Sequence, residues 1–304
     1  MIEADKYHII EDPEWGFRRL DPIPGREELS QFYENSYYEL VRKGTRGLSF
    51  RHLMAGGAPA KEELAWLSST LYADHLDVLD RERGANPKRL LDLGCGLGDF
   101  LAYTKRQGWD VVGLEPSREA VAACAAKDLE VYSLNIEEFL AQHPHYRSSF
   151  SVVSLLNILE HVPDPVEILT EAKKLLVVGG LVLIQVPNDF SEIQLSAQQA
   201  VQKKPWWIAI PDHINYFNFD SLQGLLKRLG FEVRDARGDF PMELFLLMGD
   251  DYVGNPEAGG VYHAKRRRFE LSIPADLRRR MYQALAGVGV GRNCIVVGQV
   301  GEQR

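Results

Sequence analysis

Three glycines at alternate positions, Gly94, Gly96 and Gly98, interrupt the stretch RLLDLGCGLGDF at residues 89–100. A glycine-rich turn after a buried strand commonly holds a nucleotide, because backbone without side chains can approach the ligand closely. A dinucleotide-binding turn reads Gly-x-Gly-x-x-Gly. Here the third glycine comes one place early, and Asp99 stands where that pattern has glycine. The turn therefore predicts a nucleotide site that is not specifically adapted to a pyrophosphate.

Two carboxylates accompany this turn. Asp92 precedes the first glycine by two positions, and Glu115 ends the next predicted strand. A carboxylate at the end of that second strand can accept hydrogen bonds from both hydroxyl groups of a ribose. The prediction that follows is a ligand that contains adenosine.

From Lys88 onward, the chain alternates between predicted strands and helices. Apolar, strand-like segments occur at residues 89–94, 110–116, 129–135, 150–159, 180–188, 231–239 and 293–300. Ser117 and Asp164 are the expected N-caps of two intervening helices, with Pro165 at the first helical position. This alternation predicts an α/β fold, a Rossmann-like seven-stranded and mostly parallel sheet with helices on both faces. Ligands of such sheets bind at the carboxyl ends of the strands.

Five segments contain sequence motifs in addition to the alternation of strands and helices. They read, in order, LLDLGCGLGDF, VVGLEPS, SLNIEEF, FSVVSLLNILEHVPDP and LLVVGGLVLIQVPN. Together they resemble the motifs of class I methyltransferases that depend on S-adenosylmethionine (SAM), over about residues 88–240. Asn135 replaces the commoner aspartate of that pattern, and Val178 the usual proline. The resemblance implies that SAM is the cofactor and S-adenosylhomocysteine (SAH) the product.

The resemblance also implies an organisation of the chain. Residues 1–80 would form an N-terminal cap or lid, and residues 81–304 a SAM-binding methyltransferase domain. Insertions at about 189–219 and 242–292 interrupt this domain, and insertions at strand ends are where substrate pockets are built. The helix that carries Tyr33, Tyr37 and Tyr38 would fold over the cofactor, or would simply pack on the domain.

Several residues match positions that bind the cofactor in this family. Asp92 would help to bind the ammonium group of SAM, and Glu115 both ribose hydroxyls. Asn135 would accept a hydrogen bond from the adenine amine, and the Ile136 backbone would contact the ring. The full predicted set is Asp92, Gly94, Cys95, Gly96, Gly98, Glu115, Pro116, Asn135, Ile136, Leu156, Asn157 and Tyr38.

Methyl transfer to a hydroxyl group also calls for a general base, and histidine is the side chain whose ordinary pKa suits neutral pH. His213, in IPDHINYF, lies in the first insertion, where some sugar methyltransferases carry the proposed base. Asp212 would orient it. His161, in LEHVPDP, is the second histidine at a strand end, with either a catalytic role or a role in ordering its loop. His213 is either the base or part of the pocket wall.

The acceptor is predicted from a narrower resemblance of the chain ends. GFRRLDPIPGREELSQFYENSYYEL and FPMELFLLMGDDYVGNPEAGG resemble a bacterial subgroup associated with surface-polysaccharide and sugar biosynthesis. The resemblance favours a hydroxyl of a sugar or nucleotide-sugar, with Lys265–Arg268 as contacts for a diphosphate. The alternatives are C- or N-methylation, a quinone or lipid acceptor, an NAD(P) oxidoreductase, and a SAM-binding protein without catalysis. The sequence does not indicate the oligomeric state.

Composition narrows the class of partner and the compartment. The net charge of −8 argues against a protein that wraps nucleic acid. The basic clusters at residues 265–268 and 278–280 are either solvated helix faces or contacts for a phosphorylated substrate. Three scattered cysteines suggest neither a zinc site nor a disulfide framework, and the N-terminus does not read as a signal peptide. The expected location is the cytoplasm, without a membrane span or a bound metal.

Overall fold

The computed structural model describes residues 6–32 and 48–301. Tyr33, Tyr37 and Tyr38, on which the predicted lid depends, lie outside the described residues. The lid therefore stays a prediction, as does the assignment of Tyr38 to the cofactor site.

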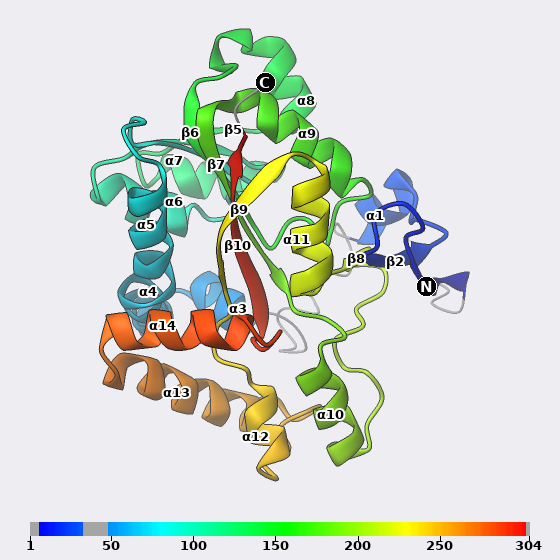
Figure 1. Ribbon diagram of the computed structural model, residues 1–304. Coiled ribbons are helices and arrows are strands. Elements are labelled where there is room, and N and C mark those ends of the chain that lie inside the picture. The colour runs from blue at the N-terminus through cyan, green and yellow to red at the C-terminus, as the bar shows by residue number, and fades with distance from the viewer. Residues whose placement is uncertain (1–5, 33–47, 302–304) are drawn as a thin grey trace.

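A central sheet runs through the molecule in the strand order β5-β4-β3-β6-β7-β10-β9 (Figure 1). Its strands are β3 (Arg89–Leu93), β4 (Asp110–Leu114), β5 (Glu130–Tyr132), β6 (Phe150–Leu156), β7 (Leu176–Pro187), β9 (Phe231–Arg237) and β10 (Asn293–Val300). Strands β3 to β7 pair in parallel, and β10 is antiparallel to both β7 and β9. The predicted seven-stranded, mostly parallel sheet is confirmed.

Both faces of the sheet are buried, which explains why its strands read as nearly continuous apolar runs. Successive side chains point to opposite faces. Leu90 and Val152 pack in one apolar cluster, and Leu91 and Val153 in the other.

Helices cover the two faces. They are α4 (Gly57–Ser69), α5 (Leu71–Glu82), α6 (Asp99–Arg106), α7 (Arg118–Ala125), α8 (Ile136–Gln142), α9 (Pro165–Leu175) and α11 (Phe219–Arg228), with a short 3-10 turn η3 at Pro144–Tyr146. The predicted caps are present: Ser117 accepts from the Ala120 amide, and Asp164 from the Glu167 amide with Pro165 at N1. Helix α5 lies in the part of the chain predicted as the cap, yet its Leu76 and Leu79 pack in the same core cluster as Leu90.

The N-terminal segment and the first insertion form a second, small sheet. Strands β1 (His8–Glu11) and β2 (Arg18–Asp21) make a hairpin, and β2 pairs with β8 (Asn215–Tyr216) of the insertion. Helix α1 (Arg26–Phe32) follows this hairpin in the chain. The pairing attaches the N-terminal hairpin to the segment that contains His213.

The remaining helices come from the N-terminal region and the two insertions. They are α3 (Leu48–Ala55), α10 (Glu192–Val201), α12 (Glu243–Leu247), α13 (Pro256–Ser272) and α14 (Ala275–Ala286). Helices α10 and α12 pack together beyond the end of the sheet at which β10 begins (Figure 1). Because β10 is antiparallel to its neighbours, this is the carboxyl end of the parallel strands. Among the described residues, no helix is both long and apolar enough to cross a lipid bilayer.

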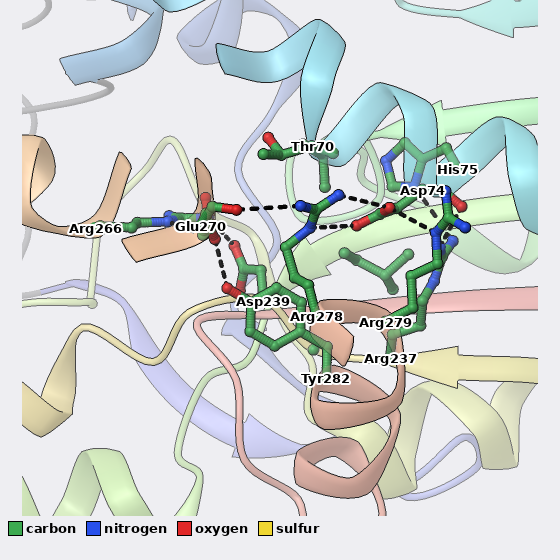
Figure 2. A pocket seen from close by; sticks show the side chains of 13 residues that line it. Thr70, Asp74, His75, Arg237, Asp239, Arg266, Glu270, Arg278, Arg279 and Tyr282 are labelled. Carbon is green, nitrogen blue, oxygen red and sulfur yellow. Dashed lines mark hydrogen bonds and ion pairs between the residues drawn. The ribbon is translucent and has the colours of Figure 1, made fainter. Parts of the chain in front are cut away.

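Each basic cluster of the second insertion combines exposed and buried side chains: Lys265, Arg268 and Arg280 are exposed, whereas Arg266 and Arg278 are buried. Arg266 is 5% exposed and donates to Asp239 at 2.9 Å and to Glu270 at 3.3 Å. Arg278 is 3% exposed and makes two bonds of 2.9 Å to the Asp74 carboxylate (Figure 2). Arg266 and Arg278 neutralise buried acids, one of which, Glu270, lies on the same helix as Arg266. Neither of these two side chains lies on a solvated helix face, and a contact of the exposed residues with a diphosphate stays a prediction.

Candidate active site

The glycine turn connects β3 to α6. Its three glycines share a left-handed backbone, but the space around Gly96 differs from that around Gly98. Gly94, Gly96 and Gly98 have φ values of 67°, 52° and 72°, in the left-handed region that glycine adopts without strain. A Cβ at Gly98 would lie 2.7 Å from the Cys124 sulfur, so this position is closed by packing. A Cβ at Gly96 would meet no atom of the described residues within 4 Å. The turn is therefore open for a ligand at Gly96 and packed against the protein at Gly98.

Glu115 ties this turn to the end of β4. Its two carboxylate oxygens accept hydrogen bonds of 2.9 Å from the backbone amides of Gly96 and Ser117. The side chain is half-buried. Each carboxylate oxygen can accept more than one hydrogen bond, so Glu115 can position the turn and still accept bonds from a pair of hydroxyls.

Asp92 lies in the middle of the sheet directly before the turn. It is 3% exposed, and its Oδ1 accepts a hydrogen bond of 2.6 Å from the Ser154 hydroxyl of β6. Burial raises the pKa of Asp92 to about 7, although the bond from Ser154 works in the opposite direction. A cationic ligand group beside it would favour the charged carboxylate.

The other predicted cofactor residues follow the neighbouring strands. Asn135 is exposed and caps α8, where its Oδ1 accepts from the Glu138 amide at 2.8 Å. This cap competes with the predicted bond from the adenine amine to the same oxygen. Ile136 begins the helix, so its amide has no partner within the helix. Asn157, after Leu156 at the end of β6, has a φ of 58° and donates its amide to the Gln185 carbonyl at 2.8 Å.

The first insertion is bonded directly to the loop after β6. The Glu160 carbonyl accepts from the Ile214 amide at 2.7 Å and from the Asn215 amide at 3.1 Å. The Asn215 side chain donates to the Leu159 and Val162 carbonyls. These bonds place Asp212 and His213 beside His161, at the carboxyl end of β6.

The predicted catalytic residues are thereby brought together. His161 Nδ1 lies 2.8 Å from the Asp212 carbonyl oxygen and 3.2 Å from its carboxylate Oδ1. The His161 and His213 rings meet edge to face, with centroids 5.0 Å apart. The structure thus joins all three residues in one cluster, although 51 positions separate His161 from Asp212 in the sequence.

The charges around His161 determine its protonation state. Burial lowers the pKa of His161, but the bond to Asp212 and the charges of Glu160 and Asp212 outweigh it and raise the pKa to about 9. Burial raises the pKa of Glu160 to about 7. At neutral pH, His161 is therefore a cation that donates hydrogen bonds and does not accept a proton.

Buried acids near the carboxyl edge were not identified from the sequence. Glu160, Asp189 and Glu243 are each at most 5% exposed, and each keeps one carboxylate oxygen without a hydrogen-bond partner in the described part of the chain. Burial raises the pKa of all three. Their sequence signal is that each follows shortly after a predicted strand. Trp207 of the first insertion is 7% exposed and packs against Phe190, so its ring is covered by the protein.

Comparison with known proteins identifies the family of the chain. A family model described as "Methyltransferase domain" matches residues 67–236. A ubiquinone biosynthesis O-methyltransferase of Aromatoleum aromaticum is 32% identical over 119 residues, which cover 37% of this chain and 50% of that protein. The enzyme of the same name from Paraburkholderia phymatum is 28% identical over 170 residues, 54% of this chain and 72% of that protein. The chain spans about half the length of most of the curated relatives that it matches.

Solved structures with a similar chain path are more distant. A SAM-dependent methyltransferase from Archaeoglobus fulgidus is 17% identical, with a TM-score of 0.47 over 75% of this chain and 92% of that chain. The plantazolicin methyltransferase BpumL in complex with SAH is also 17% identical, with a TM-score of 0.46 over 86% of this chain and 97% of that chain.

Proposed function

The chain belongs to the methyltransferase-domain family, and we propose that it is a class I enzyme that transfers a methyl group from SAM to a hydroxyl group of a small-molecule acceptor. The cluster of His161, Asp212 and His213 at the carboxyl end of β6 carries this proposal, because it lies next to the strand ends where such sheets bind ligands. In this cluster a histidine, His213, lies beside the ion pair of His161 and Asp212. A histidine in such a position can take the proton of a hydroxyl group.

The residues around the glycine turn fit the cofactor. The open space at Gly96 admits close approach of a ligand, and the buried Asp92 carboxylate suits an ammonium group. We assign Glu115 to the ribose hydroxyls and Gly94–Gly98 to the methionine part. Cys95, Pro116, Asn135, Ile136, Leu156 and Asn157 complete the proposed site. SAM, when bound, supplies a methyl group on a positively charged sulfur.

Within the cluster, we assign the base to His213. His161 is held as a cation by Asp212 and Glu160, so it is poorly suited to take a proton at neutral pH. Asp212 is bonded to His161 through both its carbonyl and its carboxylate. His161 and Asp212 are then positioning residues, and His213 takes the proton of the acceptor hydroxyl as the oxygen becomes methylated.

The acceptor that we favour is a hydroxyl of a sugar or nucleotide-sugar. Glu160, Asp189 and Glu243 each have one buried carboxylate oxygen without a hydrogen-bond partner among the described residues. These oxygens support this choice, because an acceptor rich in hydroxyl groups would donate hydrogen bonds to them. A phenolic hydroxyl of a quinone precursor is the second candidate, and it is favoured by the relatives named ubiquinone biosynthesis O-methyltransferase.

A screen with SAM labelled in its methyl group tests the proposal. Nucleotide sugars form one arm and hydroxylated quinone precursors the other, and the product is identified by mass spectrometry. Label on a hydroxyl oxygen supports the proposed reaction, and the arm that is labelled decides the acceptor class. Label on carbon or nitrogen contradicts it. Binding of SAM without transfer to any acceptor would indicate a protein without catalysis.

The role of His213 is tested with the acceptor that the screen identifies. We expect His213→Ala to lower turnover by about 10²–10⁴-fold, the usual contribution of positioned proton transfer. SAH affinity should stay within about twofold, because His213 is outside the proposed cofactor site. His145→Ala, which removes an exposed histidine elsewhere, is the matched control. Near-normal turnover of His213→Ala would place the base elsewhere.

A further inference from the structure

Two histidines converge on one buried carboxylate among residues that the proposed cofactor and acceptor sites do not use. Glu63 of α4 is fully buried, His263 of α13 is 6% exposed, and His52 of α3 has about a quarter of its side chain exposed. His52 is 11 positions and His263 is 200 positions from Glu63 in the sequence, so no spacing motif indicated the cluster. It joins the N-terminal helices to the second insertion.

The distances within this cluster match those between the ligands of a small cation. His263 Nε2 lies 3.1 Å and 3.0 Å from the two Glu63 oxygens, and His52 Nδ1 lies 3.3 Å from Oε2. One ligand atom from each residue lies within 4.8 Å of the others. In a tetrahedral zinc site with bonds of ~2.0–2.1 Å, neighbouring ligand atoms are ~3.3 Å apart. The contacts of Glu63 with both histidines therefore agree with tetrahedral coordination.

The surroundings hold the ligands in place. The indole of Trp66 packs edge-on against the His263 ring, with centroids 5.2 Å apart. Its Nε1 donates to Glu270 at 2.7 Å, which fixes the indole. A neighbouring cation opposes a metal: Arg267 lies 3.7 Å from Glu63 Oε2, but it also donates to the exposed Glu62 at 3.1 Å. Arg267 can therefore keep an ionic partner when Glu63 binds a metal.

We propose that His52, Glu63 and His263 form a binding site for a divalent transition metal, with zinc as the best match. Two imidazole nitrogens and a carboxylate are a known zinc ligand set, with a fourth position open to water. Imidazole ligands favour zinc over magnesium and calcium, which prefer oxygen ligands. The bound metal would link α3 and α4 to α13, and would so connect the N-terminal helices to the second insertion.

The test measures binding of Zn²⁺ to the full chain by competition with a chromophoric chelator, with stoichiometry from elemental analysis. We expect one Zn²⁺ equivalent in the wild type, and at least tenfold lower affinity in His52→Gln, Glu63→Gln and His263→Gln. His145→Ala, which removes an exposed histidine, is the control for binding at the surface. His213→Ala tests the other histidine cluster, which with His161 and Asp212 also offers metal ligands. Both of these variants should retain the equivalent.

A second readout keeps the test decisive if the buried variants fold poorly. Zn²⁺ should raise the melting temperature of the wild type and of His213→Ala, but not that of His52→Gln, whose side chain is partly exposed. Co²⁺ should give the visible absorption of a four-coordinate site in the same proteins. Retention of the Zn²⁺ equivalent by His52→Gln and Glu63→Gln, or its loss in His145→Ala or His213→Ala, would overturn the proposal. So would failure of the wild type to bind, which would leave a hydrogen-bonded cluster.

Discussion

At the scale of single residues, Asp92 couples the proposed cofactor site to pH. Its carboxyl is buried in the sheet, and burial raises its pKa to about 7. A bound ammonium group would stabilise the carboxylate and lower that pKa. Cofactor binding should therefore release a proton from Asp92 below about pH 7, and affinity should rise as the pH rises through this value.

We predict that SAH affinity of the wild type falls about tenfold for each pH unit below 7, the slope for linkage to one proton. In Asp92→Asn this dependence should disappear, apart from the titration of the ligand itself, and affinity at about pH 8 should be lower. Calorimetry in buffers with different ionisation enthalpies measures both the affinity and the released proton. The same pH profile in both proteins would exclude Asp92 from the site.

At the scale of elements, the turn between β3 and α6 serves two purposes that substitution can separate. Gly96→Ala places a methyl group in open space, so the fold should lose only the cost of a left-handed alanine, about 1–2 kcal/mol. The same methyl group would occupy the proposed approach of the cofactor. We therefore expect SAH affinity to fall by at least tenfold while the free energy of unfolding falls by no more than this backbone cost.

Gly98→Ala is the matched comparison, because the φ values of the two glycines are both positive. Its methyl group would lie 2.7 Å from Cys124 and from Leu129. Overpacking adds about 1–3 kcal/mol to the backbone cost, so this variant should be the less stable one in urea denaturation. Equal stability of the two variants, or unchanged SAH affinity in Gly96→Ala, would contradict this division of roles.

At the scale of the whole molecule, a buried ionic network holds α5, β9, α13 and α14 together. Asp74 of α5 accepts from Arg278 and, at 2.8 Å, from Arg279, and Arg237 of β9 donates to its carbonyl (Figure 2). We predict that Arg278→Met lowers the free energy of unfolding by about 3 kcal/mol. This is the low end for a broken buried pair, because Arg279 still neutralises Asp74.

Arg280→Met is the control for that prediction. Arg280 belongs to the same basic run, but its bond to Asp276 joins two exposed side chains, and such pairs contribute about 0–1 kcal/mol. Chemical denaturation should therefore separate the two variants by at least about 2 kcal/mol. A similar effect of both would mean that the network does not hold the insertion against α5.

The sequence by itself determined the features that depend on neighbouring residues. The glycine turn, the caps at Ser117 and Asp164 and the alternation of strands and helices follow from local backbone preference and apolar periodicity, which need no distant partner. The family could be identified for the same reason, since its motifs are short segments in a fixed order.

Only the tertiary structure decided the features that depend on contacts between distant segments. The hairpin of β1 and β2 was not identified, because its third strand, β8, lies almost 200 positions further along the chain. The exposure predicted for the 278–280 cluster failed at Arg278, because the acid that draws it inward, Asp74, is 204 positions away. His161 and Asp212 were each identified as candidates, but only the folded chain gives His161 its raised pKa. Charge and burial at a site depend on which residues surround it in space, and sequence periodicity does not encode those neighbours.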